Sequence, residues 1–230
     1  MFQGPKLRPP MRLLPSSALR RANPLRAAFT LVELLAVIAI ISILMAFLLP
    51  KIPEVMDATK VTACKKNLSE IHKMIGVYEM KYNRLPNKPG VRFFGSLYSR
   101  GAFEQTKTSA MKLTCPGVDV GSLYGIADLE PEEWFADLES VDGSYSSYAG
   151  RDTEQFPLKR MSGKEPLVAD DNDDGEGNHM TTTNVLYGDG AVNTFELFLE
   201  RENGNVDPEE EYIIVGPDSN IEDLQKFSLD

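Results

Sequence analysis

The acidic stretch "DDNDDGEGN" at residues 170–178 carries the side chains best suited to binding a hard cation. Oxygen-bearing side chains alternate along its first half and a glycine follows, as in the Asp-x-Asn-x-Asp-Gly opening of a calcium loop, whose oxygens lie about 2.3–2.6 Å from Ca²⁺. A complete EF-hand is excluded, because Thr181 stands where the bidentate glutamate is required. The alternative is a solvated acidic loop without metal. The predicted calcium ligands are Asp170, Asn172, Asp174 and Glu176.

A histidine follows this stretch, and nine residues separate His179 from the pair Asp189-Gly190. A strand over residues 181–188 would place the two ends roughly 26 Å apart at about 3.3 Å per residue, which excludes a catalytic pair. We therefore expect Asp189 to be a turn residue and His179 to be a hydrogen-bonding residue near the acidic loop. The sequence contains no nucleophile elbow, phosphate-binding glycine loop or zinc-binding helix motif, so catalysis is not expected.

The chain has two cysteines, Cys64 and Cys115, which cannot form a thiolate metal site alone. In an oxidising compartment they can form one disulfide. That bond would close a loop of about 50 residues and stabilise the fold by roughly 4 kcal/mol in the chain-entropy model. We predict a Cys64–Cys115 disulfide, with two small buried thiols as the alternative.

An apolar run at residues 29–49 contains a single charged residue, Glu33. As a helix it would span roughly 31 Å, which matches a bilayer core of about 30 Å. Cleavage after Ala28 would leave this anchor attached and free the amino group of Phe29. That ammonium could neutralise Glu33 of a neighbouring copy, because carboxylates within membrane helices usually mark a functional pairing. The alternative is a glutamate tolerated near the interface, about one turn inside the membrane.

Charge is distributed unevenly along the 230 residues. Six of the 24 basic residues and none of the 34 acidic ones lie in residues 1–28. The basic end should stay in the cytoplasm and the body should cross the membrane. The acidic body disfavours nucleic-acid binding, which depends on phosphate neutralisation.

The remaining pattern predicts an α+β fold. Apolar residues at alternating spacings of three and four predict an amphipathic helix over 54–82, ended by "NRLPNKPG". The stretch "TNVLYGDGAVNTFELF" predicts a hairpin with a type I′ turn at Asp189-Gly190. Further expectations are a helix near 129–139 and strands in "SYSSYAG" and "EYIIVG".

The segment "AFTLVELLAVIAIISILMAFLLP" resembles the N-terminal processing and methylation segment of type IV prepilins and type II secretion pseudopilins. The resemblance implies cleavage between Ala28 and Phe29 and N-methylation of Phe29. It also implies that Glu33 serves processing, methylation and subunit registration, and that Pro50 ends the membrane stretch. The family usually has glycine before the cut, where this chain has Ala28. A structural calcium in a head loop is known for major pseudopilins.

A second resemblance covers the head. "CKKNL", "LTCPG" and the His-x9-Asp-Gly spacing are similar to a group of prepilin-type proteins, and "YEMKYNRLP" is similar to a stretch of the major pseudopilin. Together the resemblances imply a basic leader (1–28), an assembly helix (29–50), an amphipathic helix (51–83) and a β-rich head (84–230).

The implied function is a structural subunit of a type II secretion pseudopilus or a type IV pilus-like filament. The implied partners are the prepilin peptidase, copies of itself and other pilin-like subunits, and the inner-membrane assembly platform and ATPase. The implied location is the inner membrane, with the head in the periplasm, or an envelope or extracellular filament. The alternatives are a monomeric membrane-anchored binding module with a calcium-stabilised head and, more remotely, an extracytoplasmic enzyme.

Overall fold

The computed structural model describes residues 30–161, 163–170 and 177–230. The chain divides into two units, which meet between Leu48 and Leu49. The described part of the first unit is Thr30 and helix α1 (Leu31–Leu48), an almost wholly apolar helix with no buried residue. The second unit contains all the other elements and the hydrophobic core.

Helix α2 (Ile52–Tyr82) is the longest element of the second unit and confirms the predicted amphipathic helix. It follows a short 3-10 turn, η1 (Leu49–Lys51), and proline occupies its first turn, where a missing backbone N–H does no harm. It ends at Asn83, whose left-handed backbone lets its N–H donate to the Glu79 carbonyl. Its buried residues follow the predicted stripe: Cys64, Leu68, Ile71, Ile75 and Tyr78.

The head contains one five-stranded antiparallel sheet with strand order β4-β3-β2-β1-β5. This sheet and the long N-terminal helix confirm the predicted α+β, pilin-like architecture. The strands are β1 (Tyr148–Arg151), β2 (Pro166–Asp170), β3 (Thr182–Tyr187), β4 (Val192–Glu196) and β5 (Phe227–Ser228).

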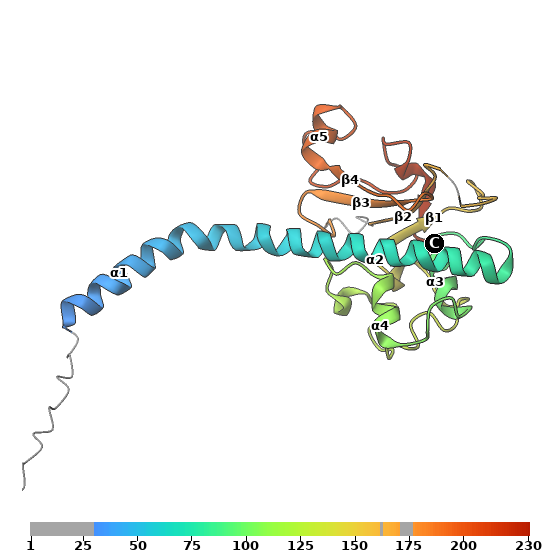
Figure 1. Cartoon of the computed structure of the whole chain (residues 1–230). Helices are drawn as coiled ribbons and strands as arrows, with labels where there is room; N and C mark the ends of the chain where they lie inside the picture. The colour runs from blue at the N-terminus through green and yellow to red at the C-terminus, as the bar shows by residue number, and fades with distance from the viewer. Residues whose placement is uncertain (1–29, 162, 171–176) are drawn as a thin grey trace, which may run out of the picture. The chain divides into compact units, whose positions relative to one another are not determined.

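Both faces of the sheet are covered by other parts of the head. Successive residues of each strand point to opposite faces, so neighbouring residues pack in different clusters. Leu186 packs in the same core cluster as α2, whereas its neighbours Val185 and Tyr187 pack with C-terminal residues. Figure 1 shows α2 crossing one face of the sheet and α5 with the C-terminal segment on the other. The short helices are α3 (Val91–Ser99), α4 (Lys107–Ala110), α5 (Leu197–Glu202), η2 (Met111–Leu113), η3 (Val120–Ser122), η4 (Gly143–Tyr145) and η5 (Leu224–Lys226).

The helix predicted near 129–139 is wrong. This segment forms consecutive turns, with i to i+3 hydrogen bonds such as the one from the Glu133 N–H to the Glu130 carbonyl. The adjacent side chains of Trp134 and Phe135 are both buried, an arrangement that suits a loop packed on the core better than a one-sided helix.

Two strand-level predictions also need correction. The "EYIIVG" segment forms no strand; its Ile213 and Val215 are buried against the sheet face instead. The hairpin between β3 and β4 is confirmed, but its turn is not type I′, because only Gly190 of the central pair has a positive φ, 87°. The Gly190 N–H donates to the Tyr187 carbonyl, and the Asp189 carboxylate accepts the Ala191 N–H, so Asp189 is indeed a turn residue. "SYSSYAG" is confirmed only at its end, where β1 begins at Tyr148.

Candidate functional sites

Helix α1 is the first candidate site, because its side chains are exposed on every side of the helix. The helical stretch Leu31–Tyr82 contains a segment long and apolar enough to cross a membrane. Ser42 is the one hydroxyl-bearing residue of α1, and its hydroxyl donates to the Ile38 carbonyl at 2.7 Å. The surface of α1 is therefore suited to lipid or to other apolar helices, and not to water.

Glu33 lies in the first turn of α1 and forms a capping box with Thr30. Both the backbone N–H and the hydroxyl of Thr30 donate to Glu33 Oε2 at 2.9 Å, and the Glu33 N–H donates to the Thr30 hydroxyl at 3.2 Å. The spacing Thr-x-x-Glu before an apolar run is the signal that could have predicted this cap. The predicted processing residues Ala28 and Phe29 lie outside the described residues.

The second candidate site is a set of four buried side chains beneath the sheet, called here the thiol cluster. Each member comes from a different segment: α2, the loop after η2, the end of β2, and the residues before β3. All four are at most 4% exposed, and their potential ligand atoms all lie within 4.8 Å of one another. The members are Cys64, Cys115, Asp170 and His179.

Hydrogen bonds link the members of the thiol cluster directly. The Cys64 thiol donates to Asp170 Oδ1 at 3.0 Å, and Cys115 Sγ lies 3.3 Å from His179 Nε2. His179 Nε2 also lies 3.6 Å from Asp170 Oδ2. The four groups therefore converge on one small volume.

Burial and the neighbouring groups shift the pKa of both thiols and of the imidazole in the cluster. Burial opposes ionisation of Cys115, but its interactions with Cys64 and His179 outweigh burial and lower the pKa of Cys115. Burial likewise disfavours a charged His179, but the interactions with Cys115 and Asp170 raise its pKa to about 9. Burial, followed by the neighbouring Cys115 and Asp170, raises the pKa of Cys64.

A second layer of donors and acceptors holds these groups in place. His179 Nδ1 lies 3.3 Å from Asp57 Oδ1. The Gly117 N–H donates to Cys115 Sγ at 3.3 Å. Asn184 donates to Asp170 Oδ2 through its backbone N–H at 2.9 Å and its side-chain amide at 2.8 Å. Each member thus has a fixed orientation within the core.

The sequence predicted a disulfide and a calcium loop as two separate sites, whereas the structure brings residues of both predictions together. The two thiols are close together but unbonded, so a disulfide stays a prediction. Asp170 directs its carboxylate into the core, while the other predicted calcium ligands, Asn172, Asp174 and Glu176, lie outside the described residues. Calcium binding likewise stays a prediction. The grouping of both cysteines with Asp170 and His179 was not predicted, because no local spacing connects them.

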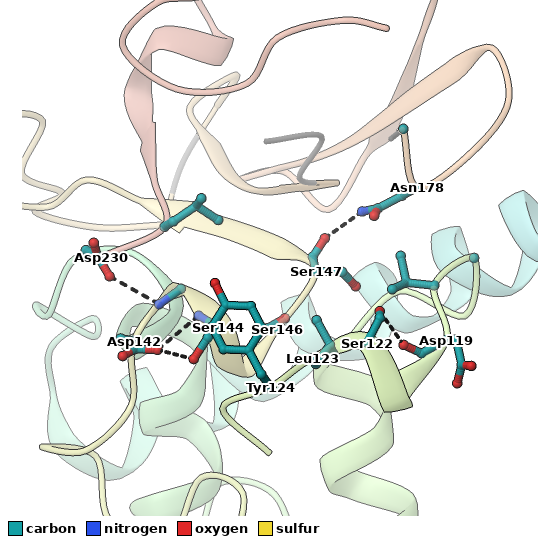
Figure 2. A pocket seen from close by; sticks show the side chains of 15 residues that line it. Asp119, Ser122, Leu123, Tyr124, Asp142, Ser144, Ser146, Ser147, Asn178 and Asp230 are labelled. Carbon is teal, nitrogen blue, oxygen red and sulfur yellow. Dashed lines mark hydrogen bonds between the residues drawn. The ribbon is translucent and has the colours of Figure 1, made fainter. Parts of the chain in front are cut away.

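A surface cavity of about 610 Å³ lies near the Asn178 side chain and is lined by several acidic residues. Figure 2 shows that these residues organise their own loops: Asp142 accepts hydrogen bonds from Ser144, and Asp230 accepts one from the Gly143 N–H. The described carboxylates of this cavity therefore have structural partners, and they form no arrangement with a nucleophile or a general base.

Comparison with known proteins identifies one segment. Residues 24–49 match the family model described as the prokaryotic N-terminal methylation motif. This match supports a prepilin-type pilin or pseudopilin, a structural and not a catalytic class, and the apolar helix and this motif fit a membrane-anchored protein. No curated protein and no solved structure matches the chain.

Proposed function

We propose that this protein is a structural subunit of a type II secretion pseudopilus or a type IV pilus-like filament. In this proposal a peptidase cuts between Ala28 and Phe29, Phe29 is N-methylated, and the anchor then leaves the bilayer for a bundle of like helices. The observation that carries the proposal is that α1, which overlaps the methylation motif, has no buried residue.

A helix that is apolar on every side has two favourable environments, the bilayer core and the centre of a helical bundle. Leu31 is 74% exposed and Phe47 is 77% exposed, so both ends of α1 offer contact area to a neighbour. Filament assembly exchanges lipid for neighbouring copies of α1 and leaves the polar head outside. In the filament, neighbouring helices then cover the same apolar surface that lipid covers before assembly.

Glu33 sets the register of this packing in our proposal. Both hydrogen bonds from Thr30 go to Oε2, and Oε1 accepts none from the described residues. An ammonium on Phe29 of an adjacent copy can bind Oε1 without breaking the cap. The bond then forms at one axial offset between two helices, because moving either helix along its axis separates the charges.

The remaining features of the proposal follow from this role. Prepilin peptidase would remove the leader in the inner membrane, and a platform protein and an ATPase would drive assembly. The head would face the periplasm. The filament would contain copies of this chain or related pilin-like subunits.

The test has two measurements on the native protein. Its intact mass should show loss of residues 1–28 and gain of one methyl group. Crosslinking of membranes should give a ladder of multimers for the wild-type chain. Glu33→Gln should abolish the ladder while leaving membrane insertion intact, because glutamine retains the cap but removes the charge. Glu54→Gln, an exposed substitution at the start of α2, is the matched control.

A retained basic leader, or an unchanged ladder in Glu33→Gln, contradicts the proposal. A single crosslinked band from a correctly processed wild-type chain favours the monomeric, membrane-anchored binding module instead.

A further inference from the structure

We propose that the thiol cluster is a structural zinc site, in which the ligands are the sulfurs of Cys64 and Cys115, a carboxylate oxygen of Asp170 and Nε2 of His179. The site lies in the head and is independent of the filament proposal. It gives a function to four buried groups that the assembly of α1 does not use.

The ligand atoms of the four groups all lie within 4.8 Å of one another, and three of the distances between them are close to those around a tetrahedral ion. Two ligand atoms of a tetrahedral zinc site lie about 3.3–3.8 Å apart, given bond lengths of about 2.0–2.3 Å. The contacts Cys115 Sγ–His179 Nε2 at 3.3 Å and His179 Nε2–Asp170 Oδ2 at 3.6 Å fall within this range. The contact of Cys64 Sγ with Asp170 Oδ1 is slightly shorter, at 3.0 Å. Small side-chain shifts would centre an ion among them.

The donor set selects the metal. Two sulfurs and an imidazole favour a borderline-soft ion over calcium or magnesium, which prefer oxygen ligands. Four protein ligands leave no open position, which is typical of structural and not catalytic zinc. Because every ligand is at most 4% exposed, the ion would also be closed to any substrate.

The second layer has the features of a metal centre. A ligating histidine usually donates its other ring nitrogen to a carboxylate or carbonyl, and here His179 Nδ1 faces Asp57 Oδ1 at 3.3 Å. The sulfurs accept hydrogen bonds as well: Cys115 from the Gly117 N–H at 3.3 Å and Cys64 from the Tyr148 hydroxyl at 3.5 Å. These donors would stabilise thiolates bound to a cation.

A disulfide explains the same four residues less well. It would join the two sulfurs but would not account for the convergence of the Asp170 carboxylate and His179 Nε2 on the same small volume. Buried charges are usually paired or bound to metal. A zinc ion coordinated by all four groups would offset two of the three negative charges that the carboxylate and the two thiolates carry.

The site would join α2 to the sheet. Its ligands come from α2, from the loop after η2, from the end of β2 and from the segment before β3. Since metal binding to such a site contributes directly to folding free energy, the ion would act as a cross-link between the helix and the head.

The test uses the full chain, purified in detergent with reductant and without chelator. Metal analysis should find about one zinc ion per chain, as expected for one four-ligand site. Cobalt exchanged into the site should give thiolate charge-transfer bands and the intense visible bands of tetrahedral coordination. His179→Gln and Cys115→Ser should each lower zinc occupancy at least tenfold, whereas His72→Gln should retain it. His72 is the matched control because its ring contacts the Gly188 carbonyl, outside the cluster.

The wild-type measurements decide the question even if the ligand variants fail to fold. Zinc removal with chelator should lower the melting temperature, and added zinc should restore it. A reduced chain that is fully folded yet holds neither zinc nor cobalt overturns the proposal. So does a native chain in which peptide mapping shows a Cys64–Cys115 disulfide.

Discussion

Asp57 of α2 binds two consecutive residues of the segment that precedes β3. Its Oδ1 lies 3.3 Å from His179 Nδ1, and its Oδ2 accepts the Met180 N–H at 3.2 Å. More than 120 positions separate Asp57 from these two residues in the sequence. One carboxylate therefore orients the imidazole of the thiol cluster and fixes the backbone beside it.

Substitution of Asp57 should test how the orientation of the His179 ring affects zinc binding, because all four proposed ligands are retained. Asp57→Asn retains the side-chain volume but cannot accept both hydrogen bonds, so His179 should lose its fixed ring orientation. We expect zinc affinity to fall about 10–100-fold, as for other second-layer carboxylates. Competition with a chromophoric chelator measures the affinity. Equal zinc affinity in the wild type and in Asp57→Asn would contradict a role of Asp57 in positioning His179. Glu54→Gln is the control substitution on the same helix.

The turn between β3 and β4 should be sensitive to a side chain at Gly190. This residue has φ of 87°, and a Cβ there would lie 3.0 Å from the His72 ring. We expect Gly190→Ala to destabilise the head by about 1–2 kcal/mol from the backbone alone, with a further loss from the contact. Gly204→Ala is a matched control, because Gly204 has φ of 76° in open space. Chemical denaturation should rank Gly190→Ala below Gly204→Ala; equal losses would exclude the contact.

Arg151 should contribute more to stability than its acidic partner. The guanidinium is buried and donates to the Phe156 and Pro166 carbonyls at 3.0 and 2.9 Å, while its ion-pair partner Glu165 is half-exposed. Arg151→Met removes the guanidinium donors of both carbonyls and should cost about 2–4 kcal/mol. Glu165→Gln removes only a screened ion pair and should cost about 0–1 kcal/mol. Urea unfolding of the two variants tests this asymmetry, and similar losses would contradict it.

The cap of α1 and its proposed assembly role should be separable. Thr30→Ala removes the hydroxyl that bonds Glu33 Oε2 and Glu33 N–H, at a helix cost of about 1 kcal/mol. It leaves the charge of Glu33, so we expect the crosslinked ladder to persist, perturbed at most in yield. Glu33→Gln should instead keep the cap and lose the ladder. A ladder lost in both variants would show that assembly needs the cap as well as the charge, and would contradict the separation of the two roles.

The elements that could be predicted from the sequence are those whose own pattern is strong. The stripe of α2 and the β3–β4 hairpin have regular apolar spacing, and both are present as expected. "EYIIVG" has strand-like composition, but its side chains pack on the sheet face and its backbone does not join the sheet. Composition alone does not distinguish these two ways of burying isoleucine and valine.

The thiol cluster could not be predicted because its members have no common local motif. Cys64 belonged to a helix stripe, Asp170 to an acidic loop and His179 to a spacing motif. Only the pairing of β2 with β3, together with the packing of α2 beneath them, brings the side chains together. The sequence pattern does not specify which face of α2 packs against which strand ends, and the cluster depends on that packing.

The dispersed origin of the thiol cluster also constrains when the head can fold. The bond between Cys64 and Asp170 joins residues 106 positions apart, and β3 lies later still in the chain. During synthesis the apolar stripe of α2 therefore emerges long before its covering strands exist. Such non-local closure slows folding, which suits the proposed location of the head in the periplasm, because that location requires the chain to cross the membrane before its tertiary structure forms.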